Sequence, residues 1–85
     1  MLLRDLPNIG PVVEQQLFAA GIKTEEDLKR TGSREAWLRI LAADSSACIH
    51  RLYALEGAIR GIPAKALAND IREALKDFYR RAKNG

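Results

Sequence analysis

The spacing of glycine and proline residues constrains the fold of this chain more than any other feature of its sequence. Six of them separate stretches in which apolar side chains recur every three or four positions, the period of an α-helix: Pro7, Pro11, Gly21, Gly32, Gly61 and Pro63. We find no alternating apolar and polar run typical of a strand, and no Asn-Gly or Asp-Gly pair between two such runs. The sequence therefore predicts an all-α fold, a compact bundle of five to six short helices.

Two short helices are predicted on either side of a tight turn near the start of the chain. The first, around residues 3 to 6, ends before Pro7, because the residue that precedes a proline avoids the helical conformation. The second begins at Pro11, whose missing N–H group costs nothing at the first position of a helix. It runs to Ala20, and Gly21 caps it.

Polar residues mark the starts of the next helices. Thr24, with Asp27 three residues later, forms a carboxylate variant of the capping box and starts a third helix. Ser33 is predicted to cap a fourth helix, and the "DSS" at 44 to 46 to end that helix and cap a fifth, which runs to about residue 60. Pro63 opens a sixth helix that extends almost to the end of the chain.

The fifth and sixth helices carry the most regular apolar faces. With about 100° of rotation per residue, the residues predicted to face the core are Cys48, Leu52, Leu55 and Ile59 on the fifth helix and Leu67, Ile71, Leu75, Phe78 and Ala82 on the sixth. The two helices are predicted to form the central helical hairpin of the bundle, over residues 46–83. Gly57 lies with Ala54 and Ala58 on another side of the fifth helix, which is small enough for a neighbouring helix to approach closely.

Composition and charge exclude several classes of protein. Apolar residues at 47% and charged residues at 29% are typical of a single globular domain, here residues 1–85. No segment approaches the roughly 20 apolar residues of a membrane span, and the acid and proline after "MLL" interrupt the apolar run of a signal peptide, so we expect a cytoplasmic protein with no membrane partner. The net charge is +3, but residues 1–32 carry four bases against five acids and residues 33–85 carry ten against six. Such a charge favours encounter with polyanions without establishing binding.

The chain offers few groups for catalysis or metal binding. Cys48 and His50 are two positions apart in the predicted fifth helix, about 200° around its axis, so they do not form a pair of nucleophile and base. Cys48 is predicted to be a small core residue and His50 a surface or boundary residue. We therefore predict a protein without enzymatic activity, cofactor or metal site.

Glu56 lies at the border of the predicted core, and two interpretations of it remain open. One is an ion pair with Arg60, four residues later, in the favourable order of acid before base. The other is a buried carboxylate that bonds to the backbone of a loop, such as the turn at Asn8, and so acts as a structural lock.

A basic ridge is predicted along the sixth helix. Five bases lie within about 80° of one another by the same rotation: Lys65, Arg72, Lys76, Arg80 and Lys83. A strip of acids at positions 70, 73 and 77 runs beside them. Two interpretations remain open: a surface for nucleic-acid phosphates or an acidic protein, and a solvated face balanced by the neighbouring acids. No aromatic residue is interleaved with the ridge, which argues against stacking on single strands.

The turn "PNIGP" and its flanking segments, residues 2–31, resemble a helix-hairpin-helix motif. That motif has a hydrophobic-x-Gly-hydrophobic-Gly pattern; Ile9 and Gly10 match its second half, and Asn8 replaces the first glycine. Asparagine tolerates the left-handed conformation better than most residues. The resemblance implies a phosphate-binding turn for DNA, formed around Asn8, Ile9, Gly10 and Val12. The alternative is a turn that only fixes the angle between two helices, because Val12 and Val13 supply no charge.

Two longer segments carry a more specific resemblance: "LPNIGPVVEQQLFAAGIKTEEDLKRTG" and "CIHRLYALEGAIRGIP". They resemble the C-terminal domain of the TfoX/Sxy family of bacterial competence regulators, in which an L-P-N-I-G-P turn, a G-I-x-T segment and an L-x-A-L-E-G-A-I-x-G helix recur in this order. The match covers about residues 3–80, and its structural motif positions are Pro7, Pro11, Gly21, Glu56 and Gly57.

This resemblance also implies a role. Full-length members of the family carry a separate N-terminal domain and act as coactivators of competence genes alongside the cAMP receptor protein. The chain has no segment that resembles the N-terminal domain, so we expect a free-standing C-terminal module.

Three functional hypotheses follow. The leading one is a non-enzymatic binding module that acts as a regulatory adaptor through contacts with a transcription-related protein, with weak, non-specific affinity for nucleic acid. The first alternative is a sequence-independent DNA-binding helix-hairpin-helix domain, whose affinity falls steeply with salt. The second alternative is a homodimerisation unit.

Overall fold

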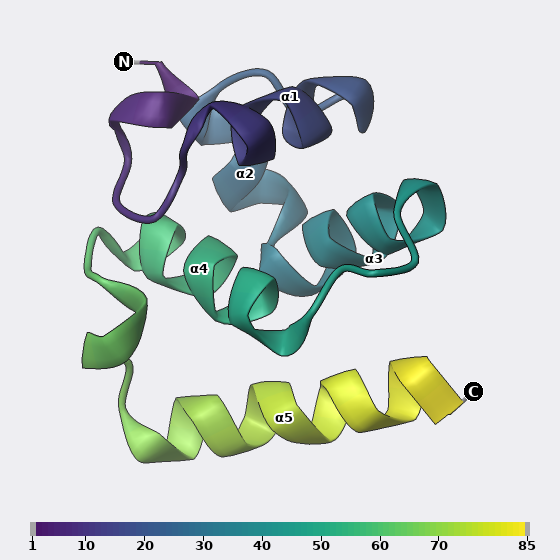
Figure 1. Cartoon of the computed structure of the whole chain (residues 1–85). Helices are drawn as coiled ribbons and strands as arrows, with labels where there is room; N and C mark the ends of the chain where they lie inside the picture. The colour runs from purple at the N-terminus through teal and green to yellow at the C-terminus, as the bar shows by residue number, and fades with distance from the viewer. Residues whose placement is uncertain (1, 85) are drawn as a thin grey trace.

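Five α-helices and two single-turn 3-10 helices make up the fold, in a computed structural model that describes residues 2–84 (Figure 1). In chain order they are η1 (Leu3–Asp5), α1 (Pro11–Ala19), α2 (Glu25–Thr31), α3 (Ser33–Ala43), α4 (Ile49–Arg60), η2 (Ala64–Ala66) and α5 (Asn69–Asn84). No strand occurs among these residues, and the predicted all-α fold is confirmed.

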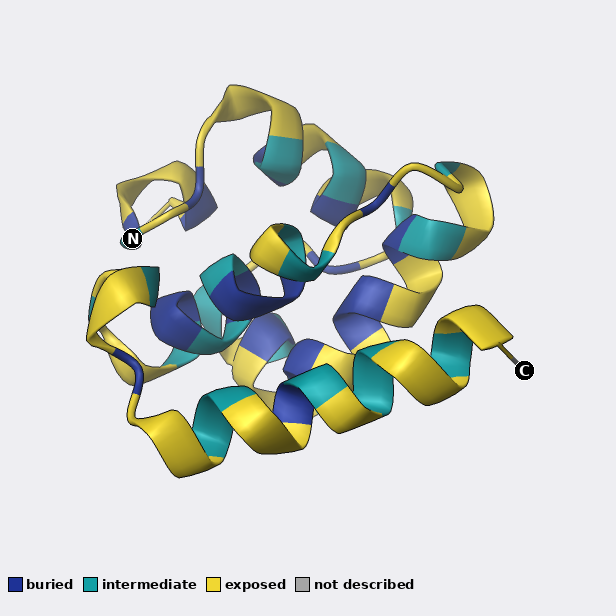
Figure 2. Cartoon of the chain, turned by 60° about the horizontal axis from the view of Figure 1, so that its bottom comes forward, coloured by how far each residue is buried: buried dark blue, intermediate teal, exposed yellow. Residues whose placement is uncertain are grey.

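The central helix is α4, which contacts α2, α3, η2 and α5. Its Leu52, Leu55 and Ala58 are almost completely buried. Helix α5 packs along one side of α4, and η1 and α1 lie on the opposite side (Figure 1). Of the predicted central pair only α4 is central, because α5 buries Leu75 alone and exposes most of its length (Figure 2).

The core is one apolar cluster, and Trp37 of α3 is its largest fully buried side chain. The Trp37 ring meets Phe78 edge-on, with 6.1 Å between ring centroids, and lies 5.5 Å from Tyr79. These aromatic contacts hold α5 against α3, since each such pair stabilises by about 0.5–1.5 kcal/mol beyond the burial of its area.

Several predicted helix ends are confirmed. Pro11 is the first residue of α1, and Gly21 follows that helix with a φ of 84°. At the start of α2, the Thr24 hydroxyl accepts a hydrogen bond from the Asp27 N–H at 3.0 Å. Gly61 ends α4 in the left-handed conformation, with a φ of 75°.

Two predicted caps and one predicted core residue are wrong. Ser33 is the first residue of α3 and not its cap, because its hydroxyl donates a hydrogen bond to Glu56 on α4 instead. Residues 44–46 end α3, but the residue at the cap of α4 is Cys48, whose side chain makes no capping bond. Cys48 is exposed. It precedes the first helical turn, so the helical rotation that assigned it to the apolar face does not apply.

The last helix also begins later than predicted. Pro63 precedes the single turn of η2, and Leu67 then adopts an extended conformation with φ −62° and ψ 137°. Leu67 is 4% exposed. Its extended backbone buries the side chain and interrupts the helix, so α5 starts only at Asn69. No helix in residues 2–84 is both long enough and apolar enough to cross a membrane.

Candidate functional site

The turn between η1 and α1 is fastened to the rest of the fold by Asn8. Its backbone is left-handed, with a φ of 70°. The Asn8 Nδ2 donates hydrogen bonds to the carbonyl oxygens of Ala54 at 3.3 Å and Ile62 at 3.0 Å, and its Oδ1 accepts one from the Ala64 N–H at 3.2 Å. One side chain therefore links the turn to α4, to the loop after α4 and to η2.

Gly57 makes this contact sterically feasible. A Cβ atom at Gly57 would lie 2.6 Å from the Asn8 Nδ2 and 2.7 Å from the Ile62 carbonyl oxygen. Both distances are far below van der Waals contact, so only glycine lets the turn and the loop approach α4 this closely. Gly57 does allow close packing, but the segments that approach it are the turn and the loop after α4, where the sequence had predicted a helix.

The backbone of the turn keeps the features of an anion site. Gly10 caps α1, and no side chain makes a capping hydrogen bond at this helix start. In residues 2–84 the N–H groups of Gly10 and Val12 have no hydrogen-bond partner, while the Ile9 N–H donates to the Leu6 carbonyl at 3.4 Å. Free N–H groups at a helix start favour negative charge, so phosphate binding by this turn stays a prediction.

Glu14 is a buried acid that the sequence did not reveal. It is 3% exposed in the first turns of α1. Arg4 binds it twice: the Arg4 N–H donates to Oε2 at 3.2 Å, and the Arg4 Nη2 lies 3.1 Å from Oε1. This pair holds η1 against α1. The burial of Glu14 has one signal in the sequence: Glu14 follows Val13 and precedes Leu17 by three residues, which places it on the inward face of α1.

Glu56 is also enclosed, with a side chain 12% exposed. Its carboxylate accepts hydrogen bonds from the Ser33 hydroxyl at 2.5 Å and from the Arg60 Nε at 2.6 Å. Burial opposes the charged form, but these bonds and the charges of Arg60 and Arg34 together hold the pKa of Glu56 below its ordinary value. The predicted pair with Arg60 is present, and the lock on the turn is made by Asn8, not by Glu56.

The predicted basic ridge is divided in the structure. Lys65 lies on η2, and the other four bases lie on α5. The Arg72 guanidinium carbon is 5.2 Å from the centre of the Tyr53 ring, and the Lys83 Nζ donates to the Ser45 carbonyl at 3.0 Å. Lys76 and Arg80 make no ion pair within 4.0 Å in the described part of the chain.

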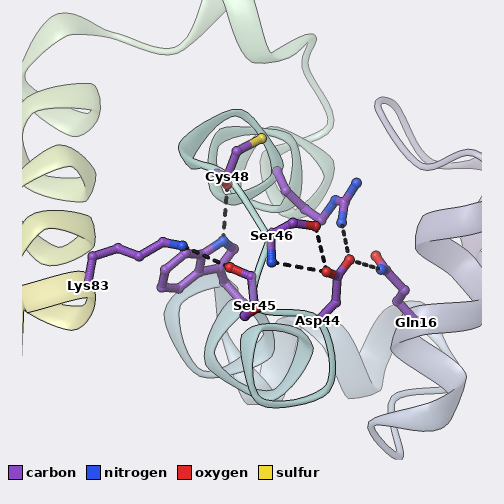
Figure 3. A network of polar contacts seen from close by, with 8 residues as sticks. Gln16, Asp44, Ser45, Ser46, Cys48 and Lys83 are labelled. Atoms are coloured by element: carbon purple, nitrogen blue, oxygen red, sulfur yellow. Dashed lines mark hydrogen bonds and ion pairs between the residues drawn. The ribbon is translucent and has the colours of Figure 1, made fainter.

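The loop between α3 and α4 gathers contacts from four helices (Figure 3). Asp44 accepts hydrogen bonds from the Ser46 N–H and hydroxyl and from the Gln16 Nε2 of α1, and lies 3.6 Å from Arg51 of α4. The pKa of Asp44 is lowered chiefly by its bonds from Ser46. Lys83 reaches the loop from α5, and the Trp37 Nε1 donates to the Cys48 carbonyl at 3.1 Å. The sequence indicated a break here but not its partners.

The titratable side chains outside these contacts do not form a shared centre. His50 is exposed, and its ring centroid lies 6.2 Å from that of Tyr53. Within residues 2–84, no group of three or more His, Cys, Asp or Glu side chains is placed to hold a metal ion.

The fold and the fastened turn define a class of protein: a small all-α domain in which an asparagine ties an N-terminal hairpin turn to a central helix. The family model of the TfoX C-terminal domain matches residues 2–79, and the chain belongs to this family. The resemblance seen in the sequence motifs is therefore confirmed.

One relative and two solved structures are similar to the chain. It is 37% identical over 76 residues to Protein Sxy of Escherichia coli (strain K12), a match that covers 89% of this chain and 36% of Sxy, so the chain spans about a third of that relative. A triclinic crystal structure of an uncharacterized protein from Listeria monocytogenes has a TM-score of 0.96 at 49% identity, over 98% of this chain and 94% of that one. A tetragonal structure of a Listeria monocytogenes protein of unknown function has a TM-score of 0.91 at 51% identity, over 94% and 98%.

Proposed function

We propose that this domain is a regulatory adaptor that acts through protein contacts and not through catalysis. Membership of the TfoX C-terminal domain family and the similarity to Sxy support a regulatory role in competence. Because the chain spans only about a third of Sxy, we assign to it one part of that role, the contact with a transcription-related protein.

The outward face of α1 is the observation that carries this proposal. Val12 and Phe18 are 65% and 42% exposed. Three further exposed residues lie within about 120° of them by helical rotation: Pro11, Gln15 and Ala19. None of the five is charged, in a chain in which 29% of residues are. Apolar side chains clustered on an exposed face favour contact with another protein.

The face of α1 is smaller than a complete protein interface. Helix α1 has nine residues and is therefore about 14 Å long. A stable interface covers roughly 800 Å² on each partner, more than this short helix offers by itself. Any stable partner, a second copy of the chain included, must therefore also contact residues of this chain outside α1.

A domain exchange tests the adaptor role. In an Escherichia coli strain that lacks its own Sxy, the matching segment of Sxy is replaced by this chain, and transcription of a competence gene is measured with a reporter. We expect the chimera to support transcription and Phe18→Glu to remove most of it. Ala42→Glu, which makes the same kind of change on an exposed position of α3, should leave it intact. A folded chimera without transcription would contradict the proposal, as would full transcription with Phe18→Glu.

A second candidate function is weak binding of DNA phosphates at the turn, and Lys65 favours it. The Asn8 Oδ1 accepts its hydrogen bond from Ala64, the residue before Lys65, so this exposed base directly follows a residue that is bonded to the turn. The rest of the predicted ridge lies on α5, across α4 from α1 (Figure 1). Lys65 is thus the ridge residue best placed to support a phosphate at the turn.

Titration of a labelled DNA duplex at low and moderate salt tests this candidate by fluorescence anisotropy. Binding should weaken steeply with salt, and Lys65→Glu should weaken it more than Lys76→Glu, which changes the net charge equally. Absence of binding at micromolar protein in low salt would exclude the candidate.

A further inference from the structure

A groove lies between the α2–α3 junction, α4 and α5, away from both the turn and the outward face of α1. Its volume is about 480 Å³, within the usual range for pockets that hold a ligand or a few inserted side chains. One apolar residue from each of three helices lines it: Leu38 of α3, Ile59 of α4 and Phe78 of α5. Leu38 is 36% exposed, so the groove presents apolar surface to solvent.

Arg34 stands at the edge of this groove with an unpaired charge. Its guanidinium carbon lies 5.8 Å from the centre of the Phe78 ring, and in residues 2–84 it makes no ion pair within 4.0 Å. The other three charged residues of the groove already have partners: Lys29 pairs with Glu25, Glu35 with Arg39, and Glu56 with Arg60. The electrostatic attraction that remains is therefore for a negative charge.

Glu56 attracts Arg34 but does not form an ion pair with it, because its oxygens hold the Ser33 hydroxyl and the Arg60 guanidinium. Arg34 also lines a smaller hollow of about 200 Å³, whose other charged residues are Glu56, Arg60 and Asp70. That volume is below the usual range for a pocket that holds a ligand. An anionic group on Arg34 is therefore expected to enter from the larger groove.

We infer that this groove binds an acidic amphipathic peptide segment of a partner protein. An apolar side chain of the segment packs between Leu38, Ile59 and Phe78, and a carboxylate pairs with Arg34. An apolar centre with a charged edge is the usual composition of a peptide-binding groove. The inference does not rest on the proposed contact of α1, and it would give the adaptor a second, separate surface.

Two synthetic helical peptides serve as probes. Both carry leucine and phenylalanine at helical spacing; the other positions are glutamate in the acidic peptide and lysine in the basic one. Each is titrated into the isotope-labelled full chain, and amide and methyl NMR shifts locate the binding site. The acidic peptide should shift Leu38, Ile59 and the residues around Phe78, and should bind more tightly than the basic one.

Charge reversal at Arg34 then tests the role of the guanidinium. Arg34→Glu should weaken binding of the acidic peptide by about tenfold, since it replaces an attraction with a repulsion, and should favour the basic peptide. Arg80→Glu, which changes the net charge equally on the exposed side of α5, should leave the affinity within about twofold. Arg34→Gln places no new charge beside Glu56 and should give an intermediate loss of affinity. It keeps the test valid if Arg34→Glu fails to fold.

Three outcomes would overturn the inference: no binding of either peptide at millimolar concentration, shifts located outside the groove, or equal losses for Arg34→Glu and Arg80→Glu. None of them bears on transcription by the Sxy chimera. A failure here is thus distinguishable from failure of the adaptor role.

Discussion

Replacing Gly57 with alanine sets two effects of opposite sign against each other. Alanine in the interior of a helix is more stable than glycine by about 1 kcal/mol, so by propensity alone the variant should be more stable than the wild type. The new Cβ, however, would lie 2.6 Å from the Asn8 Nδ2 and 2.7 Å from the Ile62 carbonyl oxygen. The Asn8 side chain can rotate away only by losing its hydrogen bonds, and the Ile62 carbonyl belongs to the backbone.

The structure predicts that the steric effect wins. Overpacking of this kind costs about 1–3 kcal/mol, and the involvement of backbone places Gly57→Ala in the upper part of that range. After the gain in helix propensity, the free energy of unfolding should fall by about 1–2 kcal/mol. For a domain of this size, the midpoint of thermal unfolding should fall by roughly 5–15 °C.

Urea denaturation followed by circular dichroism and by Trp37 fluorescence measures this change. Ala74→Gly, at an exposed position of α5, measures the difference in helix propensity between alanine and glycine in the same protein. It should lower the free energy of unfolding by about 1 kcal/mol. If Gly57→Ala raises the free energy of unfolding instead, the loop after α4 yields at no cost, and the argument that close approach requires glycine is refuted.

Three further predictions concern single residues. Asn8→Ala removes three hydrogen bonds and leaves a residue with a Cβ in the left-handed conformation, so it should lower the free energy of unfolding by about 2–3 kcal/mol; Asn8→Gly, which avoids the conformational strain, should lose less in the same urea assay. The pKa of Glu56 is lowered from 4.5, so the stability it contributes is present above that pH and is lost as the pH falls through the folded-state pKa; Glu56→Gln should therefore lose less stability on acidification than the wild type, and equal losses would contradict the assignment. Cys48 is exposed, so a thiol reagent should modify it in the native protein, and a reaction limited by unfolding would contradict its exposure.

The all-α fold was predictable because its signals are local. Helical spacing of apolar residues, Pro11 at a helix start and Gly61 at a helix end act through neighbouring residues, and the structure follows them. The start of α5 was not predictable from the sequence. The segment "PAKALA" favours a helix locally, whereas burial of Leu67 imposes an extended conformation on that residue. Cys48 was placed in the core for a similar reason: helical rotation was applied to a residue that precedes the helix.

The candidate sites depend on contacts between distant residues, and the sequence predicts them less well. The left-handed backbone of Asn8 follows from the tolerance of asparagine for that conformation, but the partners of its side chain are 46 to 56 residues away. The ion pair of Arg4 with Glu14, the bond of Gln16 to Asp44 and the separation of Lys65 from α5 all arise from packing between elements. No local pattern in the chain carries that information.

The attachment of Asn8 sets a limit on how this domain can be divided. By sequence, residues 2–31 look like a self-contained hairpin motif, yet the groups that hold its turn in place belong to Ala54, Ile62 and Ala64. Excised, that segment would lose them and expose the inner side of α1, so the smallest transplantable unit extends from the turn at least to η2. A larger protein that uses this architecture must inherit it as a whole, and the match to Sxy over 89% of the chain accords with such indivisibility.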